Sequence, residues 1–147
     1  MTQIESVLHR SPIRVTLARI LIGAVLLMNL QAAAAFLFWP SRFVGSFELT
    51  GTVGEATLRG MAVLFLMWNV PYAVAFWNPL RYRVSLYEAI AMQTIGVVGE
   101  TIIYQTLPDI HIQARSAIWR FILFDGLGLL ALIAAACLTK IKRTQKS

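Results

Sequence analysis

The 147-residue sequence contains one cysteine, two histidines and three lysines, and only 14% of its residues are charged. The single cysteine, Cys137, excludes an internal disulfide, a CxxC redox pair and a thiolate metal cage. The histidines, His9 and His111, lie outside the long apolar segments, which excludes a bis-histidine haem between membrane helices. Because all three lysines lie within residues 140–146, a buried Schiff-base lysine is excluded as well. We therefore expect no cofactor held by histidine, by cysteine or by a covalent bond.

Motifs for an independent enzymatic activity are also absent. The sequence has no GxSxG nucleophile elbow, no P-loop and no HExxH motif, and its His, Cys and carboxylate residues do not cluster at metal-ligand spacing. The net charge of +6 comes from basic residues at the edges of apolar segments and not from a basic stripe interleaved with aromatic residues. Binding to nucleic acid is therefore not expected.

Apolar residues dominate what is present. They make up 58% of the sequence, and the mean hydropathy is +0.68. Soluble globular proteins average about 45–50% apolar and about 25% charged residues. Four apolar segments of about 20 residues or more fill the length, which predicts an all-α integral membrane bundle of four transmembrane helices in one domain, residues 1–147. The expected helices cover about residues 12–39, 53–77, 85–104 and 117–138.

Local patterns refine two of these helices. Thr52 and Glu55 have the spacing of a capping box, which predicts that the second helix begins there. Ser85 and Glu88 predict the start of the third helix in the same way. Pro71 lies inside the second helix, where it removes a backbone hydrogen bond and predicts a kink.

Basic residues are distributed unequally between the two ends of the expected bundle. Four spans place both termini on one side, and that side carries nine Lys and Arg residues against four on the other. Because basic residues in short loops are retained in the cytoplasm, this distribution predicts that both termini are cytoplasmic. Aromatic side chains are expected at both interfaces: Trp39, Tyr104 and Trp119 at the outer one, and Trp77, Tyr82 and Tyr87 at the inner one.

Charged residues near the outer ends of the spans form the first candidate site. Counted at about 1.5 Å per residue, three of them share one depth and the fourth lies about one and a half turns deeper. This outer polar cluster consists of Arg59, Glu100, Arg120 and Asp125. Because a charge in the hydrocarbon is costly, two bases and two acids on three helices predict an ion-paired cluster. The cluster either holds the helices together or binds an anion, a lipid head group or a proton.

A second polar layer near the middle of the membrane is the second candidate site. It consists of Asn29, Gln31, Trp68, Asn69, Tyr72 and Gln93. Trp68 and Tyr72 lie four residues apart and can form the walls of a flat pocket beside the proline kink. Gln93, Gly96 and Glu100 lie on one face of the third helix, which joins the two layers. The layer either forms hydrogen bonds between helices, each contributing about 0.6–2 kcal/mol, or binds a quinone-like or lipid-like ligand.

The sequence resembles a known family in its layout. The pattern Ala18-Arg19-Ile20-Leu21-Ile22-Gly23 opens the first helix, a loop with Pro40 follows it, and Leu58-Arg59-Gly60 opens the second helix. With the glycine-bearing third helix, these features are similar to the DoxX-like group of small four-helix bacterial membrane proteins. Some members of that group are subunits of complexes that pass electrons to quinone. The resemblance implies a multi-pass protein of the bacterial cytoplasmic (inner) membrane with an accessory role, and it assigns no catalytic residue.

Two functions follow as expectations. The first is an accessory or assembly subunit of a larger membrane complex, with a quinone-linked redox complex as its candidate host. Its partners would be membrane lipids and other membrane-protein subunits, and its ligand a quinone or a lipid. The second is a homodimeric transporter of small molecules or protons, in which Glu100 and Asp125 titrate between Arg59 and Arg120. A homodimer is required because four helices are few for a monomeric carrier.

Overall fold

The computed structural model describes residues 12–140. Within this range the chain forms four long α-helices and two short 3-10 helices, and no strand. The elements are α1 (Pro12–Phe38), η1 (Pro40–Arg42), η2 (Val44–Phe47), α2 (Gly51–Trp77), α3 (Arg83–Thr106) and α4 (Ile112–Thr139). The expected all-α fold with four long helices is confirmed for this part of the chain. Of the basic residues used to predict the orientation, Arg10, Lys142, Arg143 and Lys146 lie outside the described residues, and so does His9.

All four α-helices are long and apolar enough to cross a membrane. They contain 24 to 28 residues, which at about 1.5 Å per residue gives about 36–42 Å, more than the hydrocarbon core of about 30 Å. Their outward faces are apolar as well: Leu27, Ile95 and Leu130 expose 67%, 70% and 65% of their surface. A soluble bundle turns such side chains inward, so this pattern is consistent with a multi-pass membrane protein.

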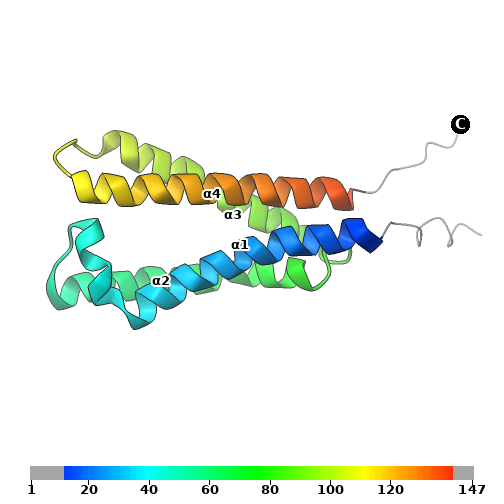
Figure 1. Ribbon diagram of the computed structural model, residues 1–147, viewed down its shortest axis with the longest axis horizontal. Helices are drawn as coiled ribbons and strands as arrows, with labels where there is room; N and C mark the ends of the chain where they lie inside the picture. Colours follow the sequence, from blue (N-terminus) through cyan, green and yellow to red (C-terminus); the bar gives the residue numbers. More distant parts are fainter. Residues whose placement is uncertain (1–11, 141–147) are drawn as a thin grey trace, which may run out of the picture.

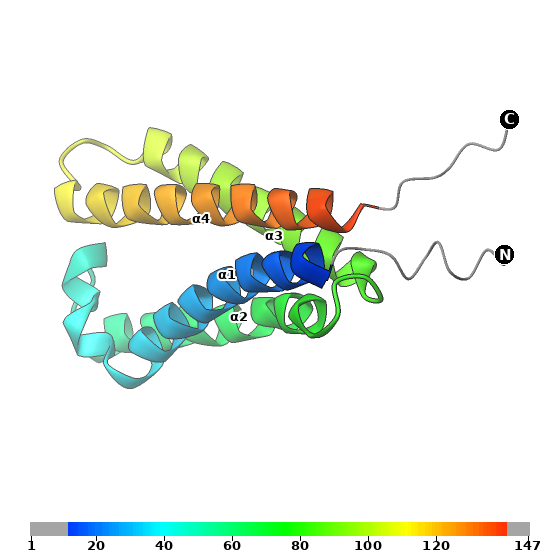
Figure 2. The ribbon, with the colours of Figure 1, turned by 45° about the vertical axis from the view of Figure 1, so that its right-hand side comes forward.

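The two ends of the bundle differ in composition and in shape. The start of α1, the end of α4 and the turn at residues 78–82 lie at one end, the terminal end, while η1, η2 and the loop at residues 107–111 lie at the other, the loop end (Figure 1). Among the described residues, α1 and α3 each contact α2 and α4 but not one another. The α1–α2 pair and the α3–α4 pair converge at the terminal end and diverge at the loop end (Figure 2).

The core of this wedge-shaped bundle differs between its two ends. Toward the terminal end, each helix contributes one fully buried alanine to the core: Ala18, Ala75, Ala89 and Ala135. Small side chains let helix backbones approach closely. Toward the loop end the core is built around the ring of Phe36, whose centre lies 5.3–6.2 Å from four other phenylalanine rings: Phe43, Phe47, Phe65 and Phe121. These bulky rings occupy part of the space where the helix pairs diverge.

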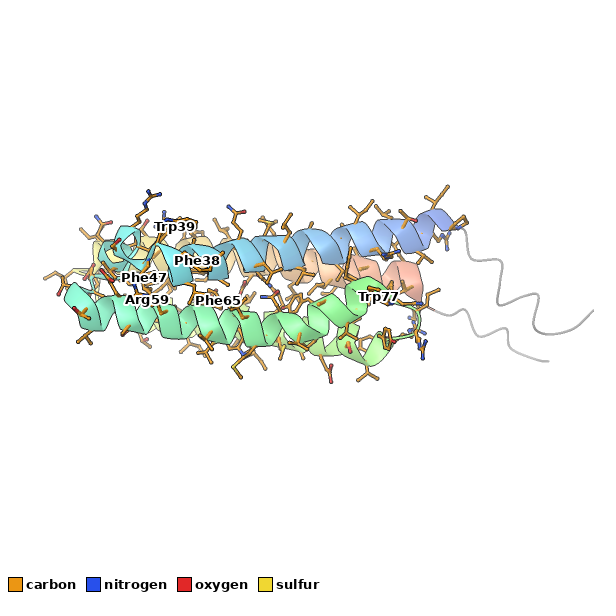
Figure 3. The ribbon with its side chains drawn as sticks, turned by 90° about the horizontal axis from the view of Figure 1, so that it is seen from below. Phe38, Trp39, Phe47, Arg59, Phe65 and Trp77 are labelled. Carbon is orange, nitrogen blue, oxygen red and sulfur yellow. The ribbon has the colours of Figure 1, made fainter. Side chains whose placement is uncertain are left out.

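Helix α2 contains the predicted proline but not the predicted cap. The helix continues through Pro71 and bends between Phe65 and Trp77 (Figure 3). Trp39 and Trp77 lie near opposite ends of the bundle, as expected of interfacial aromatic residues (Figure 3). The predicted capping box at Thr52 is wrong, because α2 already begins at Gly51 and its N-cap residue makes no side-chain hydrogen bond.

The predicted capping box at Ser85 is also wrong. Helix α3 begins two residues earlier, at Arg83, and its N-cap residue, Tyr82, makes no side-chain cap. The physical reason lies in the preceding turn. The side-chain oxygen of Asn78 accepts hydrogen bonds from the backbone N–H groups of Leu80 and Arg81, and its carbonyl accepts one from Tyr82. This asparagine turn directs the chain into α3 before Ser85 is reached.

Candidate functional site

Glu48 connects the segment that carries η1 and η2 to the start of α4. Its Oε1 accepts hydrogen bonds from the backbone N–H groups of Gln113 (3.1 Å) and Ala114 (3.3 Å), and its Oε2 lies 2.6 Å from Nδ1 of His111. A carboxylate at this position complements the unpaired amides and the positive end of the helix dipole. The hydrogen bond with His111, and then those with the two amides, hold the pKa of Glu48 below its ordinary value of 4.5.

This contact explains why α4 begins at Ile112 and not near residue 117, as predicted. The cap comes from a residue more than sixty positions away in the sequence, so no local pattern marks it. Glu48 adopts a left-handed backbone conformation with a φ of 56°, which is uncommon for a residue with a side chain. The conformation turns the chain between η2 and α2 so that the carboxylate reaches α4.

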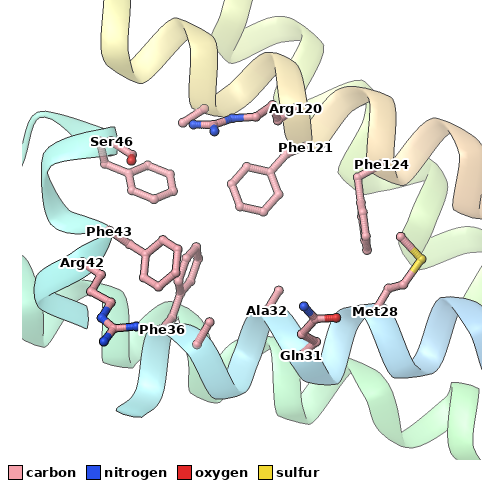
Figure 4. A pocket seen from close by; sticks show the side chains of 13 residues that line it. Met28, Gln31, Ala32, Phe36, Arg42, Phe43, Ser46, Arg120, Phe121 and Phe124 are labelled. Carbon is pink, nitrogen blue, oxygen red and sulfur yellow. The ribbon is translucent and has the colours of Figure 1, made fainter. Parts of the chain in front are cut away.

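A pocket of about 500 Å³ lies at the loop end between α1, α4 and the segment 40–47 (Figure 4). We call it the loop-end pocket. Its lining residues are Met28, Gln31, Ala32, Ala35 and Phe36 from α1, Arg42, Phe43, Ser46 and Phe47 from the segment, and Ala117, Arg120, Phe121 and Phe124 from α4. Five of the eight phenylalanines of the chain are among them. Its volume falls within the range of about 300–1,000 Å³ that is common for small-molecule sites.

The charged groups of the loop-end pocket are two arginines. Arg42 approaches from η1 beside α1, and Arg120 approaches from α4 on the opposite side (Figure 4). The lining contains no carboxylate, and within the described residues neither arginine forms an ion pair or a hydrogen bond. The site therefore combines an aromatic interior with two guanidinium groups that have no partner in the part of the chain described.

A polar network crosses the bundle between the alanine layer and the phenylalanine cluster. The hydroxyl of Tyr72 on α2 donates to Oε1 of Gln93 on α3 at 2.5 Å, and it lies 3.2 Å from the carbonyl oxygen of Ala89. Nε2 of Gln93 donates to Oδ1 of Asp125 on α4 at 2.9 Å. Tyr72 and Gln93 are almost fully buried. The network joins three helices in an interior where unpaired polar groups are costly.

The structure distributes the four residues of the predicted outer polar cluster over three places and forms no ion pair among them. Arg59 pairs with Glu55 of its own helix at 3.3 Å, and Arg120 lines the loop-end pocket. Asp125 accepts from Gln93 and lies against Gly96, one turn before Glu100 on the same face of α3. One carboxylate oxygen of Glu100 is buried and has no hydrogen-bond partner among residues 12–140.

The predicted mid-membrane residues do not line one pocket either. Tyr72 and Gln93 lie together because their side chains form a hydrogen bond with one another. Asn69 is buried and donates to the carbonyl of Phe65 on its own helix, while its side-chain oxygen has no partner in the described part of the chain. The other three residues are apart from them: Trp68 is 45% exposed, Asn29 is half-buried, and Gln31 lines the loop-end pocket.

Arginines that were interpreted as orientation signals also cap helix ends. Nε of Arg19 donates to the carbonyl of Phe76 near the end of α2, and Nη2 of Arg83 donates to that of Thr139 at the end of α4. Carbonyls in the last turn of a helix lack an intrahelical donor and carry the negative end of the helix dipole. The arginine of a neighbouring helix supplies both the donor and the positive charge.

The end of α3 is capped in the same way by Arg115 of α4. Its Nη1 donates to the carbonyls of Tyr104 (2.9 Å) and Leu107 (2.5 Å), and its guanidinium lies 4.2 Å from the centre of the Tyr104 ring. Its Nη2 also pairs with the exposed Asp109 at 3.3 Å. Both terminal nitrogens of Arg115 thus have partners, whereas Arg42 and Arg120 have none among the described residues.

Sequence reasoning missed the residues of the segment 40–47 that complete the loop-end pocket. The available signal was the concentration of phenylalanines in two short stretches, residues 36–47 and 121–124, each with an arginine in or beside it. Nothing in the sequence indicated that the two stretches meet.

Comparisons of the chain with protein-family models, with curated proteins and with solved structures found no match. The similarity to the DoxX-like group therefore stays a prediction. The contacts, burial and charges of the described residues carry the functional argument that follows.

Proposed function

We propose that this protein is a multi-pass protein of the bacterial cytoplasmic membrane that binds a membrane amphiphile in the loop-end pocket and acts as a small accessory subunit. The observation that carries the proposal is the pocket itself, an aromatic cavity between α1, α4 and the segment 40–47. Concave, mostly apolar sites with a few polar groups are typical of ligand binding. A lipid or a quinone that diffuses in the membrane has the matching chemistry.

The proposed orientation places both termini in the cytoplasm. The described basic residues at the terminal end are Arg14, Arg19, Arg81, Arg83 and Lys140. They support a cytoplasmic terminal end by the positive-inside rule. The loop-end pocket then lies in the outer half of the membrane.

Co-purification tests the proposed function. The full chain is extracted from its native membrane in nanodiscs, and the bound lipids, quinones and proteins are identified by mass spectrometry. Ala35→Phe places a ring in the pocket, and Ala24→Phe places the same ring on an exposed position of α1 as the matched control. We expect a stoichiometric amphiphile that Ala35→Phe removes and Ala24→Phe retains. An amphiphile content equal in all three proteins contradicts pocket binding, and the absence of any co-purifying protein contradicts the accessory role.

A homodimeric proton-coupled carrier is the second proposal, and Glu100 is the observation that favours it. A carboxylate oxygen that is buried without a partner in an apolar bundle is costly, so such groups are usually retained for a function. In this proposal Glu100→Gln or Asp125→Asn abolishes a pH-dependent flux in proteoliposomes, while Glu55→Gln, which alters an exposed pair at the same end, preserves it. Unchanged flux in both variants rules the carrier out.

A further inference from the structure

We propose that the loop-end pocket takes an anionic membrane lipid, with its phosphate or carboxylate head group between Arg42 and Arg120 and one apolar chain among the phenylalanine rings. This inference rests on the proposed function and narrows the class of ligand. It is carried by the two arginines of the lining, the absence of a carboxylate from the lining, and the course of the pocket along α1.

Arg42 and Arg120 determine where we place the head group of the lipid in the pocket. Arg59 and Arg115, which also lie at the loop end, are matched by acidic partners, whereas Arg42 and Arg120 have none among the described residues. A cation at the edge of the hydrocarbon is stabilised by a counter-charge. Guanidinium groups bind phosphate and carboxylate oxygens through two parallel hydrogen bonds. Arg42 and Arg120 are both exposed at the pocket, where an anionic head group can pair with them.

The acid nearest in sequence to Arg42 does not neutralise this pair. Both carboxylate oxygens of Glu48 are occupied by His111 and by the first amides of α4. The hydroxyl of Ser46 is the one further polar group that the segment 40–47 contributes to the lining. The head-group end is therefore positively charged, and it offers a neutral hydroxyl in addition to the guanidinium groups.

The apolar interior of the pocket is where we place the apolar chain of the lipid. Along α1 the lining runs from Phe36 back to Met28, which is eight residues or about 12 Å of helix. Ala32 and Ala35 have small side chains, which leave space beside α1. On the opposite side, Phe124 of α4 faces Met28 (Figure 4). A slot of this form accommodates one extended apolar chain. A free inorganic anion leaves the slot empty, and a neutral quinone offers carbonyl acceptors but no counter-charge for the guanidinium groups, so an anionic lipid fits better than either.

A matched pair of lipids tests the head group. The full-length protein is reconstituted in phosphatidylcholine vesicles that contain equal amounts of phosphatidic acid and diacylglycerol with the same acyl chains. The lipids retained after mild extraction are counted by native mass spectrometry. We expect phosphatidic acid to be retained about tenfold over diacylglycerol, the effect of one charge-assisted hydrogen bond. The double variant Arg42→Gln/Arg120→Gln removes this preference, and Arg59→Gln, which removes one positive charge outside the pocket, keeps it.

The remaining outcomes separate this inference from the proposed function. If the wild type retains both lipids equally and Ala35→Phe loses both, the pocket binds amphiphiles without charge selection, and the anionic ligand is overturned while the proposed function stands. If Ala35→Phe retains as much lipid as the wild type, both are overturned. If excess inorganic phosphate displaces phosphatidic acid, the anion alone binds and the role of the chain is overturned.

Discussion

Gln93 of α3 and Asp125 of α4 are joined by a hydrogen bond of 2.9 Å, and each side chain lies against a glycine of the opposite helix. The amide of Gln93 covers Gly128, and the carboxylate of Asp125 covers Gly96. The missing side chains of the two glycines provide the space that both polar groups occupy. The pair thus crosses a tightly packed helix interface, and Tyr72 extends it to α2.

The central amide of this network is expected to stabilise the bundle. Gln93→Leu removes the partner of Asp125 and one of the two partners of Tyr72, so it should lower the free energy of unfolding by about 1–3 kcal/mol. Denaturation with sodium dodecyl sulfate in mixed micelles measures the change. Gln105→Leu, at an exposed position of the same helix, is the control, and equal stability of both variants would show that the network contributes nothing.

The glycine beneath Gln93 gives a second prediction. A Cβ at position 128 would lie 2.7 Å from Nε2 of Gln93, whereas nothing lies within 4 Å of a Cβ at position 126. Gly128→Val should therefore cost about 1–3 kcal/mol through overpacking, and Gly126→Val should cost much less. Thermal unfolding in detergent compares the two. A larger loss in Gly126→Val would contradict the described packing of α3 on α4.

Arg115 is expected to contribute more to stability than the exposed arginines at the loop end. Arg115→Gln loses the hydrogen bonds to two carbonyls and the contact with the Tyr104 ring, which should cost about 1.5–3 kcal/mol. Arg59→Gln loses only a surface pair within one helix, worth about 0.3–0.5 kcal/mol. Unfolding free energies of the two variants measure this difference, and equal losses would refute the capping role.

The cap that Glu48 provides for α4 is expected to depend on pH. Because the pKa of Glu48 is lowered in the folded protein, its stabilisation is fully present above the ordinary value of 4.5 and is lost as the pH falls through the lowered value. The protection of the Gln113 and Ala114 amides, measured as the ratio of intrinsic to observed hydrogen-exchange rate, should therefore fall in acid. Glu48→Gln should remove this dependence, and Glu55→Gln should keep it. Protection that is independent of pH in the wild type would contradict the cap.

The four helices were predictable because their signal is local and repeated over many residues. Runs of about twenty apolar residues specify a membrane helix whatever its neighbours are, and Pro71 marks a bend by its own geometry. The start of α4 was not predictable in this way. Its cap is supplied by Glu48 through a turn with positive φ, which depends on tertiary structure.

For the candidate sites, the depth of a side chain in the bundle was predictable, but its direction around the helix was not. Counting residues places Gln93 and Tyr72 at one depth, and the structure joins them. The count does not say which way a side chain points around its helix. Arg59 and Arg120 therefore shared a predicted level with Glu100, although the first pairs along its own helix and the second lines the loop-end pocket.

The wedge shape also determines how a molecule in the loop-end pocket can leave. At the terminal end the four helices meet around fully buried alanines, with Ile22, Leu86 and Leu132 filling the core beside them. The lining of the pocket includes none of these residues, so the pocket does not continue through the alanine layer. If the protein binds a membrane amphiphile as proposed, the ligand would exchange on the loop-end side alone, and movement to the terminal end would require the alanine layer to separate.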